Sequence, residues 1–295
     1  MEKIGFIILT HDNSSQSLTL LSKLNQLYDF PPIAWHHDFS QSDFPKSKLT
    51  VNVNMVQDYV KTSWGTFSLV EAKLKALKLL YNISSPKYYL TLSGADYPVR
   101  AAKDVLHSLD TLEGDVFMRS VRVPIGNFNK PWEKQYYDRY CSLKFLFQRK
   151  NKNNIKVVSQ ITLIRNPLVT RFFNPFNKNL QCWGGEFWYT GNATAAQYLL
   201  DYVEKDEFGV VEHYKNTKIP DESIFQTIFK NAPKLRCIDN NFRYVDWSEG
   251  LSSPKSINSE DIYKIQGTGA HFARKFDSVN SLEAMKLIDA TLNIC

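Results

Sequence analysis

The chain has 295 residues, of which 43% are hydrophobic and 14% aromatic, with only 12 Gly and 12 Pro. A chain this apolar can offset the entropy cost of ordering by burial, which excludes the disordered and fibrous classes of protein. A net charge of +6, from 36 Lys and Arg against 30 Asp and Glu, is too small for a generic nucleic-acid binder unless the charge is clustered on one face.

The first residues predict a strand followed by a helix. Ile4 to Thr10 is a short β-rich run closed by polar turn residues, and Ser14 to Tyr28 carries leucines at helical spacing. The first run is too short for the apolar core of a signal peptide. No stretch reaches the about 20 apolar residues of a membrane span. We therefore expect a soluble protein, unless a targeting segment has been removed.

The alternation of strands and helices continues along the first third of the chain. Strands are predicted at Pro32 to Asp38, Leu49 to Val56 and Tyr88 to Ser93, and a long amphipathic helix at Phe67 to Tyr81. This order predicts an α/β fold with a mainly parallel sheet. We see no internal repeat and no biased linker, so a single domain over 1–295 is expected.

Polar side chains gather where the predicted strands end. In open α/β sheets, ligands bind beyond the carboxyl ends of the strands. Here those ends carry Thr10-His11-Asp12, His36-His37-Asp38 and Ser93-Gly94-Ala95-Asp96. The three ends together indicate a binding site, although turns favour Asp and Ser in any case, and His11 or His36 alone could equally be a solvent-facing bystander.

Two kinds of biased segment follow residue 120. Pro131 to Tyr140 interleaves aromatic and charged residues, which suits a sugar-binding surface and an ordinary amphipathic helix equally well. Basic clusters occur at 144–156 and 264–275, and residues 148–154 are predicted to form an exposed polar loop. Most such runs are solvated surface, and a membrane-surface or anionic-ligand role is the less favoured interpretation.

Three segments of the C-terminal half indicate a floor, a carboxylate and a cation around one pocket. They are Trp183 to Trp188, Pro220-Asp221-Glu222 and Phe272 to Asp277. Pro220 opens an amphipathic run, so Glu222, two residues later, is expected in the first turn of a helix. There the helix macrodipole favours the ionised carboxylate, which is the form that a general base needs. Taken alone, the same three residues fit an ordinary helix start, which is the commoner case.

Several familiar catalytic motifs are absent from the sequence. There is no Walker A loop, G-x-G-x-x-G, G-x-S-x-G or H-E-x-x-H motif. Cys141, Cys182, Cys237 and Cys295 have no close spacing, so neither a zinc site nor a disulfide framework is indicated, and reduced thiols are expected. The Asp-x-Asp pair that many nucleotide-sugar transferases use to hold a metal is also absent. If a diphosphate binds, cations of the protein must neutralise it.

The chain resembles a known family, the core-two/I-branching N-acetylglucosaminyltransferase and peptide O-xylosyltransferase group, which is glycosyltransferase family fourteen. Seven pieces follow the family's order through most of the chain. These are the strand ending in His11, His36-His37-Asp38, the segment from Ser63-Trp64-Gly65 to Ala72, Leu92 to Pro98, Gly184 to Trp188, Pro220-Asp221-Glu222 and Ala273 to Asp277.

The resemblance implies a GT-A-like single domain with a Rossmann-like central sheet flanked by helices. Residues 1–120 would form its nucleotide-binding half and 121–295 its acceptor and catalytic half. The family transfers a sugar from a UDP donor with inversion and without a metal, so no cofactor is expected. By resemblance Glu222 is the base that takes the acceptor's proton, and Lys275 stabilises the departing diphosphate.

The resemblance assigns further residues to the two substrates. On the donor side it implies His11, Asp38, Lys255, Arg274 and Lys275. Lys255 stands where the animal branching enzymes have Arg, and Lys cannot make Arg's bidentate contacts. On the sugar or acceptor side it implies the residues Ser93, Asp96, Glu186, Trp188 and Trp247.

The function expected from these assignments is transfer of a sugar, with N-acetylglucosamine the favoured one, to a glycan or lipid-linked oligosaccharide during surface polysaccharide synthesis. Transfer from UDP-xylose is the alternative within the class. A carbohydrate- or nucleotide-binding protein without turnover is the alternative outside it, and no nucleic-acid partner is expected. The animal enzymes have a membrane anchor, a stem and disulfides, so a bacterial-type cytoplasmic member is expected, with peripheral contact at the inner face of the membrane left open.

Overall fold

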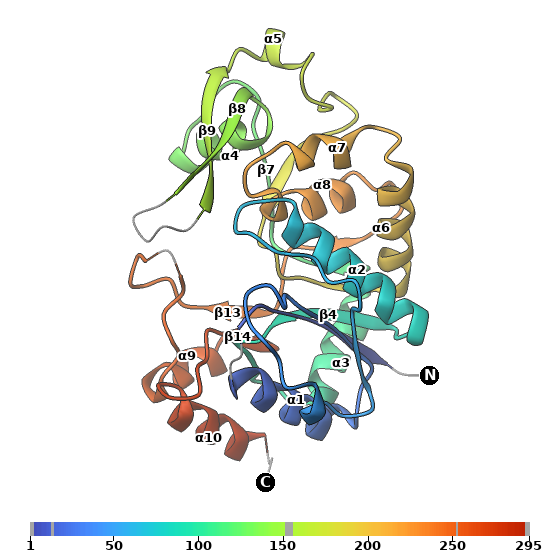
Figure 1. Ribbon diagram of the computed structural model, residues 1–295, viewed down its shortest axis with the longest axis vertical. Helices are drawn as coiled ribbons and strands as arrows, with labels where there is room; N and C mark the ends of the chain where they lie inside the picture. Colours follow the sequence, from blue (N-terminus) through green and yellow to red (C-terminus); the bar gives the residue numbers. More distant parts are fainter. Residues whose placement is uncertain (1–2, 13–14, 151–155, 252, 293–295) are drawn as a thin grey trace.

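A seven-stranded sheet forms the centre of the computed structural model, which describes residues 3–12, 15–150, 156–251 and 253–292 (Figure 1). In spatial order the strands are β12 (Cys237–Ile238), β6 (Val116–Phe117), β11 (Thr190–Asn192), β4 (Tyr88–Ser93), β1 (Ile4–Thr10), β2 (Ile33–His37) and β3 (Val53–Met55). Strand β11 runs antiparallel to both of its neighbours, and every other ladder is parallel. The predicted α/β fold with a mainly parallel sheet is confirmed.

Both faces of this sheet are buried, which is why its strands are almost continuously apolar. Ile7, Ala34 and Tyr89 pack into one core, and Phe6 and Leu90 into the core on the opposite face. The first core is covered by α2 (Ser68–Ile83), α6 (Ala193–Lys205), α7 (Val210–Lys215) and α8 (Ile224–Lys230) (Figure 1). The second is covered by α1 (Ser15–Tyr28) and α3 (Ala102–Leu112).

A second, three-stranded sheet places the C-terminal third of the chain against the end of the first. Its order is β13 (Arg243–Val245), β14 (Phe272–Arg274) and β5 (Asp96–Pro98). Strands β13 and β14 are parallel, so the residues that follow them leave the sheet at the same edge. A third core joins this sheet to η3 (Ser259–Asp261), α9 (Ile262–Gln266) and α10 (Leu282–Thr291).

The remaining elements lie at the upper end of the molecule in Figure 1. They comprise the ladder of β7 (Ser120–Arg122) with β10 (Trp183–Gly185), the helices α4 (Pro131–Tyr140) and α5 (Pro167–Thr170), and the hairpin of β8 (Leu143–Lys150) and β9 (Lys156–Ile164). The short helices η1 (Lys46–Lys48) and η2 (Pro220–Glu222) complete the fold. The division into halves at residue 120 stays a prediction.

The elements predicted for the first third of the chain agree with the structure, with one exception. The strands Ile4–Thr10 and Tyr88–Ser93 are observed to the residue, and the helices at 15–28 and 68–83 lie within two residues of the predicted bounds. The strand predicted over 49–56 is only three residues long, Val53–Met55, because the chain turns at Val51, which is fully exposed.

Two predictions for the second half are wrong. Residues 148–150 do not form a loop but end strand β8, while 151–155 lie outside the described residues. Pro220 does not open an α-helix but a 3-10 turn, Pro220–Glu222. Ser223 interrupts the helical backbone with φ −148°, so α8 begins only at Ile224.

The described cysteines Cys141, Cys182 and Cys237 are free thiols, as expected, whereas Cys295 lies outside the described part of the chain. Across the described ranges, we find no helix with the length and hydrophobicity needed to cross a bilayer.

Candidate functional site

The carboxyl ends of β1, β2 and β4 lie side by side, because these strands are parallel neighbours. They bring His11, Asp38 and Ser93 to one edge of the sheet, as the sequence predicts. The His11 side chain is exposed, and its carbonyl accepts a hydrogen bond from Ser42 Oγ at 3.1 Å. It is therefore open to a ligand.

Asp38 is buried and fully occupied. Its carboxylate accepts hydrogen bonds from the backbone and hydroxyl of Ser40, from Gln41 Nε2, and from the backbone and hydroxyl of Thr62. Burial raises the pKa of Asp38, but these hydrogen bonds outweigh it and hold the pKa well below its usual range. Asp38 thus fixes the loop at residues 60–62, and it exposes no oxygen to a uridine in this structure.

Asp96 is buried at the start of β5 and faces a cation that the sequence analysis missed. Ser93 donates to Asp96 Oδ2 from its backbone N–H and from its hydroxyl. Arg243 Nη1 lies 3.7 Å from Asp96 Oδ1, and Arg243 Nη2 donates to the Thr91 carbonyl at 2.8 Å. Asp96 therefore neutralises a buried arginine and shapes the turn after β4. No sequence motif marks Arg243.

Arg274 and Lys275 provide the cations nearest to this turn. Arg274 lies opposite Asp96 in the β14–β5 ladder, and its guanidinium carbon is 4.8 Å from the centre of the Trp188 ring. The Phe276 N–H donates to the Ala95 carbonyl at 2.9 Å, which places Lys275 beside the turn. Neither cation forms an ion pair with a residue that the structure describes. Both are available to an anionic ligand.

Lys255 and Trp247 reach the same edge of the second sheet. The Lys255 N–H donates to the Asp246 carbonyl, and Trp247 is more than half exposed. The Lys255 ammonium, however, donates to both carboxylate oxygens of the buried Asp261, at 2.8 and 3.0 Å. This ammonium is already paired, with an aspartate that also pairs with Lys264 at 3.2 Å, which makes Lys275 the freer of the two lysines.

The carboxylate of Glu222 is held by Arg139. Glu222 Oε2 accepts from Arg139 Nη1 at 2.8 Å, and Oε1 accepts no hydrogen bond within the described ranges. Burial raises the pKa of Glu222 above its usual value, and the positive charge of Arg139 offsets only part of this rise. The sequence suggested that a helix N-terminus stabilises the ionised form of Glu222. In the structure, Arg139 does so instead.

The segment at 184–186 forms a floor next to this carboxylate. A Cβ atom on Gly184 would lie 2.0 Å from the Tyr136 ring, and one on Gly185 would lie 2.2 Å from the Arg119 carbonyl oxygen. Glycine is therefore required for the ring and backbone to approach this closely. Glu186 Oε2 accepts from Asn241 Nδ2 at 2.6 Å, which fixes the side chain of Glu186.

This floor joins the carboxylate to the cations. The Tyr136 ring packs against Gly184 and lies 5.6 Å from the guanidinium carbon of Arg139, which holds Glu222, so this ion pair lies beside the floor. Further along the chain, Trp188 carries the guanidinium of Arg274 over its ring. The three segments that the sequence predicts around one pocket are thus connected. Arg139, which pairs with Glu222, lies in the aromatic and charged segment Pro131–Tyr140, and the structure shows that this segment is helix α4.

A second carboxylate, Asp221, lies buried behind Glu222. The positive charge of Lys73 acts on it; the Lys73 ammonium is buried, lies 3.5 Å from the centre of the Tyr189 ring and donates to the Phe187 carbonyl at 2.7 Å. Burial raises the pKa of Asp221 to about 7, and the nearby charge of Glu222 adds to the effect. The folded protein therefore holds a proton on Asp221 at pH values where the unfolded chain has lost it.

We expect Asp221→Asn to change the pH dependence of stability. Because the folded-state pKa is raised, the wild-type free energy of unfolding falls between about pH 4 and about pH 7, by about 2 to 4 kcal/mol relative to the variant. Urea unfolding of both proteins across this range measures the difference. Parallel curves would show that Asp221 does not titrate there.

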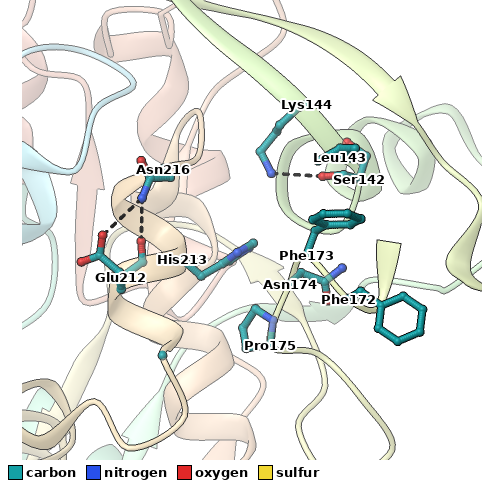
Figure 2. A pocket seen from close by; sticks show the side chains of 11 residues that line it. Ser142, Leu143, Lys144, Phe172, Phe173, Asn174, Pro175, Glu212, His213 and Asn216 are labelled. Carbon is teal, nitrogen blue, oxygen red and sulfur yellow. Dashed lines mark hydrogen bonds between the residues drawn. The ribbon is translucent and has the colours of Figure 1, made fainter. Parts of the chain in front are cut away.

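A hollow of the molecule lies away from these residues, at the base of the hairpin. It measures about 500 Å³ and lies between β8, the chain at 172–175 and α7 (Figure 2). Lys144 and His213 line it, and burial lowers the pKa of Lys144 to about 8 and that of His213 to about 4. It includes none of the site residues predicted from the sequence.

Within the described ranges, no three His, Cys, Asp or Glu side chains are arranged so that they could hold a metal ion. That the site works without a metal or cofactor stays a prediction. If cations of the protein face the diphosphate, Arg274 and Lys275 are the candidates.

Comparison with known proteins gives one family match. The family model for the Core-2/I-Branching enzyme matches residues 4–268. Xylosyltransferase 1 from Homo sapiens is 23% identical over 312 residues, which cover 97% of this chain and 30% of that protein. Xylosyltransferase 2 from Mus musculus is 22% identical over 97% of this chain and 33% of its own length. The chain thus spans about a third of the length of these relatives.

Solved structures give weaker similarity. The crystal structure of S. aureus TarS 1–349 has 12% sequence identity and a TM-score of 0.35, covering 89% of this chain and 63% of that one. The same fragment in complex with UDP-GlcNAc has a TM-score of 0.34 and covers 64% of that chain.

Proposed function

The chain belongs to the Core-2/I-branching enzyme family of glycosyltransferases, with the GT-A-like α/β fold expected for it, and we propose that it is an inverting, metal-independent transferase that moves a sugar from a UDP donor to a hydroxyl of a glycan acceptor. One observation carries the proposal. The segment from Gly184 to Trp188 links an arginine-held carboxylate, Glu222, to Arg274 and Lys275, two cations without an ion pair among the described residues.

The proposed reaction is a single displacement at the anomeric carbon of the donor sugar. Glu222 takes the proton from the acceptor hydroxyl as its oxygen bonds to that carbon, and the bond from the carbon to the UDP oxygen breaks. The configuration inverts because the attack comes from the face opposite the leaving group. Glu222 suits this role because Arg139 holds one oxygen and favours the ionised form, while Oε1 accepts no hydrogen bond from a described residue.

The leaving group carries the negative charge that develops during the reaction. Lys275 and Arg274, beside the turn after β4, are proposed to stabilise it, with Arg274 oriented by the Trp188 ring. The exposed His11, at the neighbouring strand end, is proposed to contact the uridine, and Asp38 to support that pocket through the loop at 60–62. Trp247 is proposed to face the acceptor.

We expect transfer to survive excess EDTA, because Arg274 and Lys275 can supply the positive charge that a divalent metal supplies elsewhere. The measurement is UDP release with and without chelator. Loss of activity in EDTA and its rescue by manganese would contradict metal independence.

We propose UDP-N-acetylglucosamine as the donor. This choice rests on the match to the Core-2/I-Branching enzyme model, and the similarity to xylosyltransferases over nearly the whole chain makes UDP-xylose the second candidate. Incubation of the purified protein with a panel of UDP-sugars, followed by measurement of UDP released by slow hydrolysis, identifies the donor. Binding of a UDP-sugar without any turnover, even with glycan acceptors added, would indicate a carbohydrate- or nucleotide-binding protein instead.

The biological setting is proposed on the same basis. We propose a glycan or lipid-linked oligosaccharide as the acceptor, a role in surface polysaccharide synthesis, and a cytoplasmic location at the inner face of a bacterial membrane. Each follows from the family resemblance, and transfer assays with membrane extracts from the source cell as acceptor test them together.

A further inference from the structure

The charge of the chain is concentrated in one segment. Residues 139–185 contain nine Lys or Arg and no Asp or Glu, whereas the whole chain has a net charge of only +6. The rest of the chain is therefore net acidic. This segment contains the β8–β9 hairpin, α5 and the chain that leads to β10, which lie together at the upper end of the molecule (Figure 1).

The same hairpin exposes an apolar face. Phe145 and Ile161 are paired across the hairpin and point to one side, with Phe147 and Leu163 two residues further along each strand. Phe145 is 60% exposed and Leu163 also 60%. The opposite side of the hairpin packs on α4, where Gln160 Nε2 donates to a carbonyl of that helix. We call Phe145, Phe147, Ile161 and Leu163 the hairpin face.

A second exposed apolar group follows in the chain. Leu168, Phe172 and Phe173 are 68%, 72% and 57% exposed. The guanidinium of Arg171 lies 4.7 Å from the centre of the Phe172 ring, so a cation accompanies this group as well. Phe172 and Phe173 stand at the rim of the hollow described above (Figure 2). Soluble monomers seldom leave so many large apolar side chains exposed together without a partner.

We propose that the hairpin face and the 168–173 segment dock the protein on an anionic lipid bilayer. The combination of positive charge with aromatic and aliphatic side chains is the pattern that binds at a bilayer surface, where the apolar side chains enter the acyl boundary and the cations meet anionic headgroups. A soluble anionic polymer would match the charge, but it would leave exposed Ile161, Leu163 and Leu168 without a partner.

The position of this surface gives docking a consequence for the proposed function. The hairpin packs on α4, and α4 contacts the chain around the Pro220–Glu222 turn: Arg139 donates to Glu222 at 2.8 Å and the Tyr140 hydroxyl donates to the Ile219 carbonyl at 2.6 Å. A protein held by the hairpin would present Glu222 toward an acceptor carried on a lipid. This step rests on the proposed transferase function, whereas the docking itself does not.

Sedimentation of the full chain with vesicles tests the docking without any sugar donor. We expect binding to phosphatidylcholine vesicles that contain phosphatidylglycerol, little binding to phosphatidylcholine alone, and a fall in binding as salt is raised. Replacing Phe145 and Ile161 together by Ser should lower the vesicle partition coefficient roughly tenfold, because two inserted side chains are lost. Phe30→Ser, at a phenylalanine 56% exposed elsewhere, is the matched control and should bind normally.

A charge variant tests the same surface independently. Arg149→Gln combined with Arg171→Gln should also weaken binding, by roughly thirtyfold, since each cation near an anionic surface contributes about fivefold. Lys48→Gln combined with Lys103→Gln removes the same charge elsewhere and should not. Normal vesicle binding by both surface variants would overturn the proposal. So would selective binding to soluble dextran sulfate, with vesicle binding of the Phe145 and Ile161 variant unchanged.

Failure of the membrane-docking proposal can be distinguished from failure of the proposed transferase function. The surface variants should release UDP from a soluble donor at the wild-type rate, because they change no residue of the Glu222 and Lys275 site. A protein that binds vesicles but hydrolyses no UDP-sugar would keep the docking surface and lose the transferase proposal.

Discussion

Glu222→Gln is expected to retain UDP-sugar binding and lose transfer by about a hundred- to ten-thousand-fold. The amide keeps the shape of the side chain and can still accept a hydrogen bond from Arg139, but it cannot take up the acceptor's proton. Single-turnover transfer measured next to donor affinity separates the two effects. Near-normal turnover would remove Glu222 from the role of base.

Two further variants make this result specific. Glu283→Gln changes an exposed glutamate on α10 and should be silent. Arg139→Gln should keep more activity than Glu222→Gln, and it should move the acid limb of the pH–rate profile to higher pH, because the positive charge of Arg139 lowers the pKa of Glu222. An unchanged acid limb would show that this ion pair does not set the base's protonation.

Sequence patterns predicted β1, β2 and β4 of the central sheet well because these strands are buried on both faces, whereas the short strands β6, β11 and β12 were not predicted. The apolar run at Ile4–Thr10 and that at Tyr88–Ser93 allow few other structures, and both strands were predicted to the residue. The start of α8 was missed for a local reason. Ile219 takes a left-handed backbone with φ 55° and Ser223 breaks the helix, and neither residue type signals this.

The candidate site was only partly predictable because its ionic partners are far apart in the sequence. Arg139 and Glu222 are separated by 83 residues, and Arg243 meets Asp96 across two different strands of the second sheet. No spacing rule links such pairs. Lys255 is different, because its partner Asp261 is only six residues further along the chain. Asp261 forms a capping box with Asn258, and this local pattern marks it as the partner of the Lys255 ammonium.

These ionic contacts distinguish two kinds of charged residue in the site. Asp38 and Asp261 are buried and satisfied by neighbours of the protein, and the buried Asp96 accepts from Ser93 and faces Arg243, so all three fix loops and sheet edges. His11 and Lys275 reach solvent and have no charged partner among the described residues, so they remain available to substrate. The strongest test of the donor site is therefore at Lys275 and not at Lys255.

Lys275→Ala is expected to weaken UDP and UDP-sugar binding and to slow transfer more than it weakens acceptor binding. A fixed ammonium on the diphosphate acts most strongly once negative charge builds on the leaving group, so its loss should cost roughly 3 kcal/mol in the transition state, or about a hundredfold in rate. Titration calorimetry with UDP and transfer kinetics measure the two effects. If Lys275 is only a surface lysine, stability changes by no more than about 0.5 kcal/mol and the kinetics stay the same.

Two comparison variants decide whether the effect belongs to Lys275 itself. Lys286→Ala removes an exposed lysine paired with Glu283 on α10, and it should leave UDP affinity and turnover unchanged. Lys255→Ala removes a lysine that already pairs with Asp261, so we expect a smaller loss of UDP affinity than for Lys275→Ala. The reverse order would mean that Lys255 leaves Asp261 when the diphosphate binds and that it, and not Lys275, carries the leaving group. Equal UDP affinity and turnover in wild type and Lys275→Ala would leave the phosphate role of Lys275 without support.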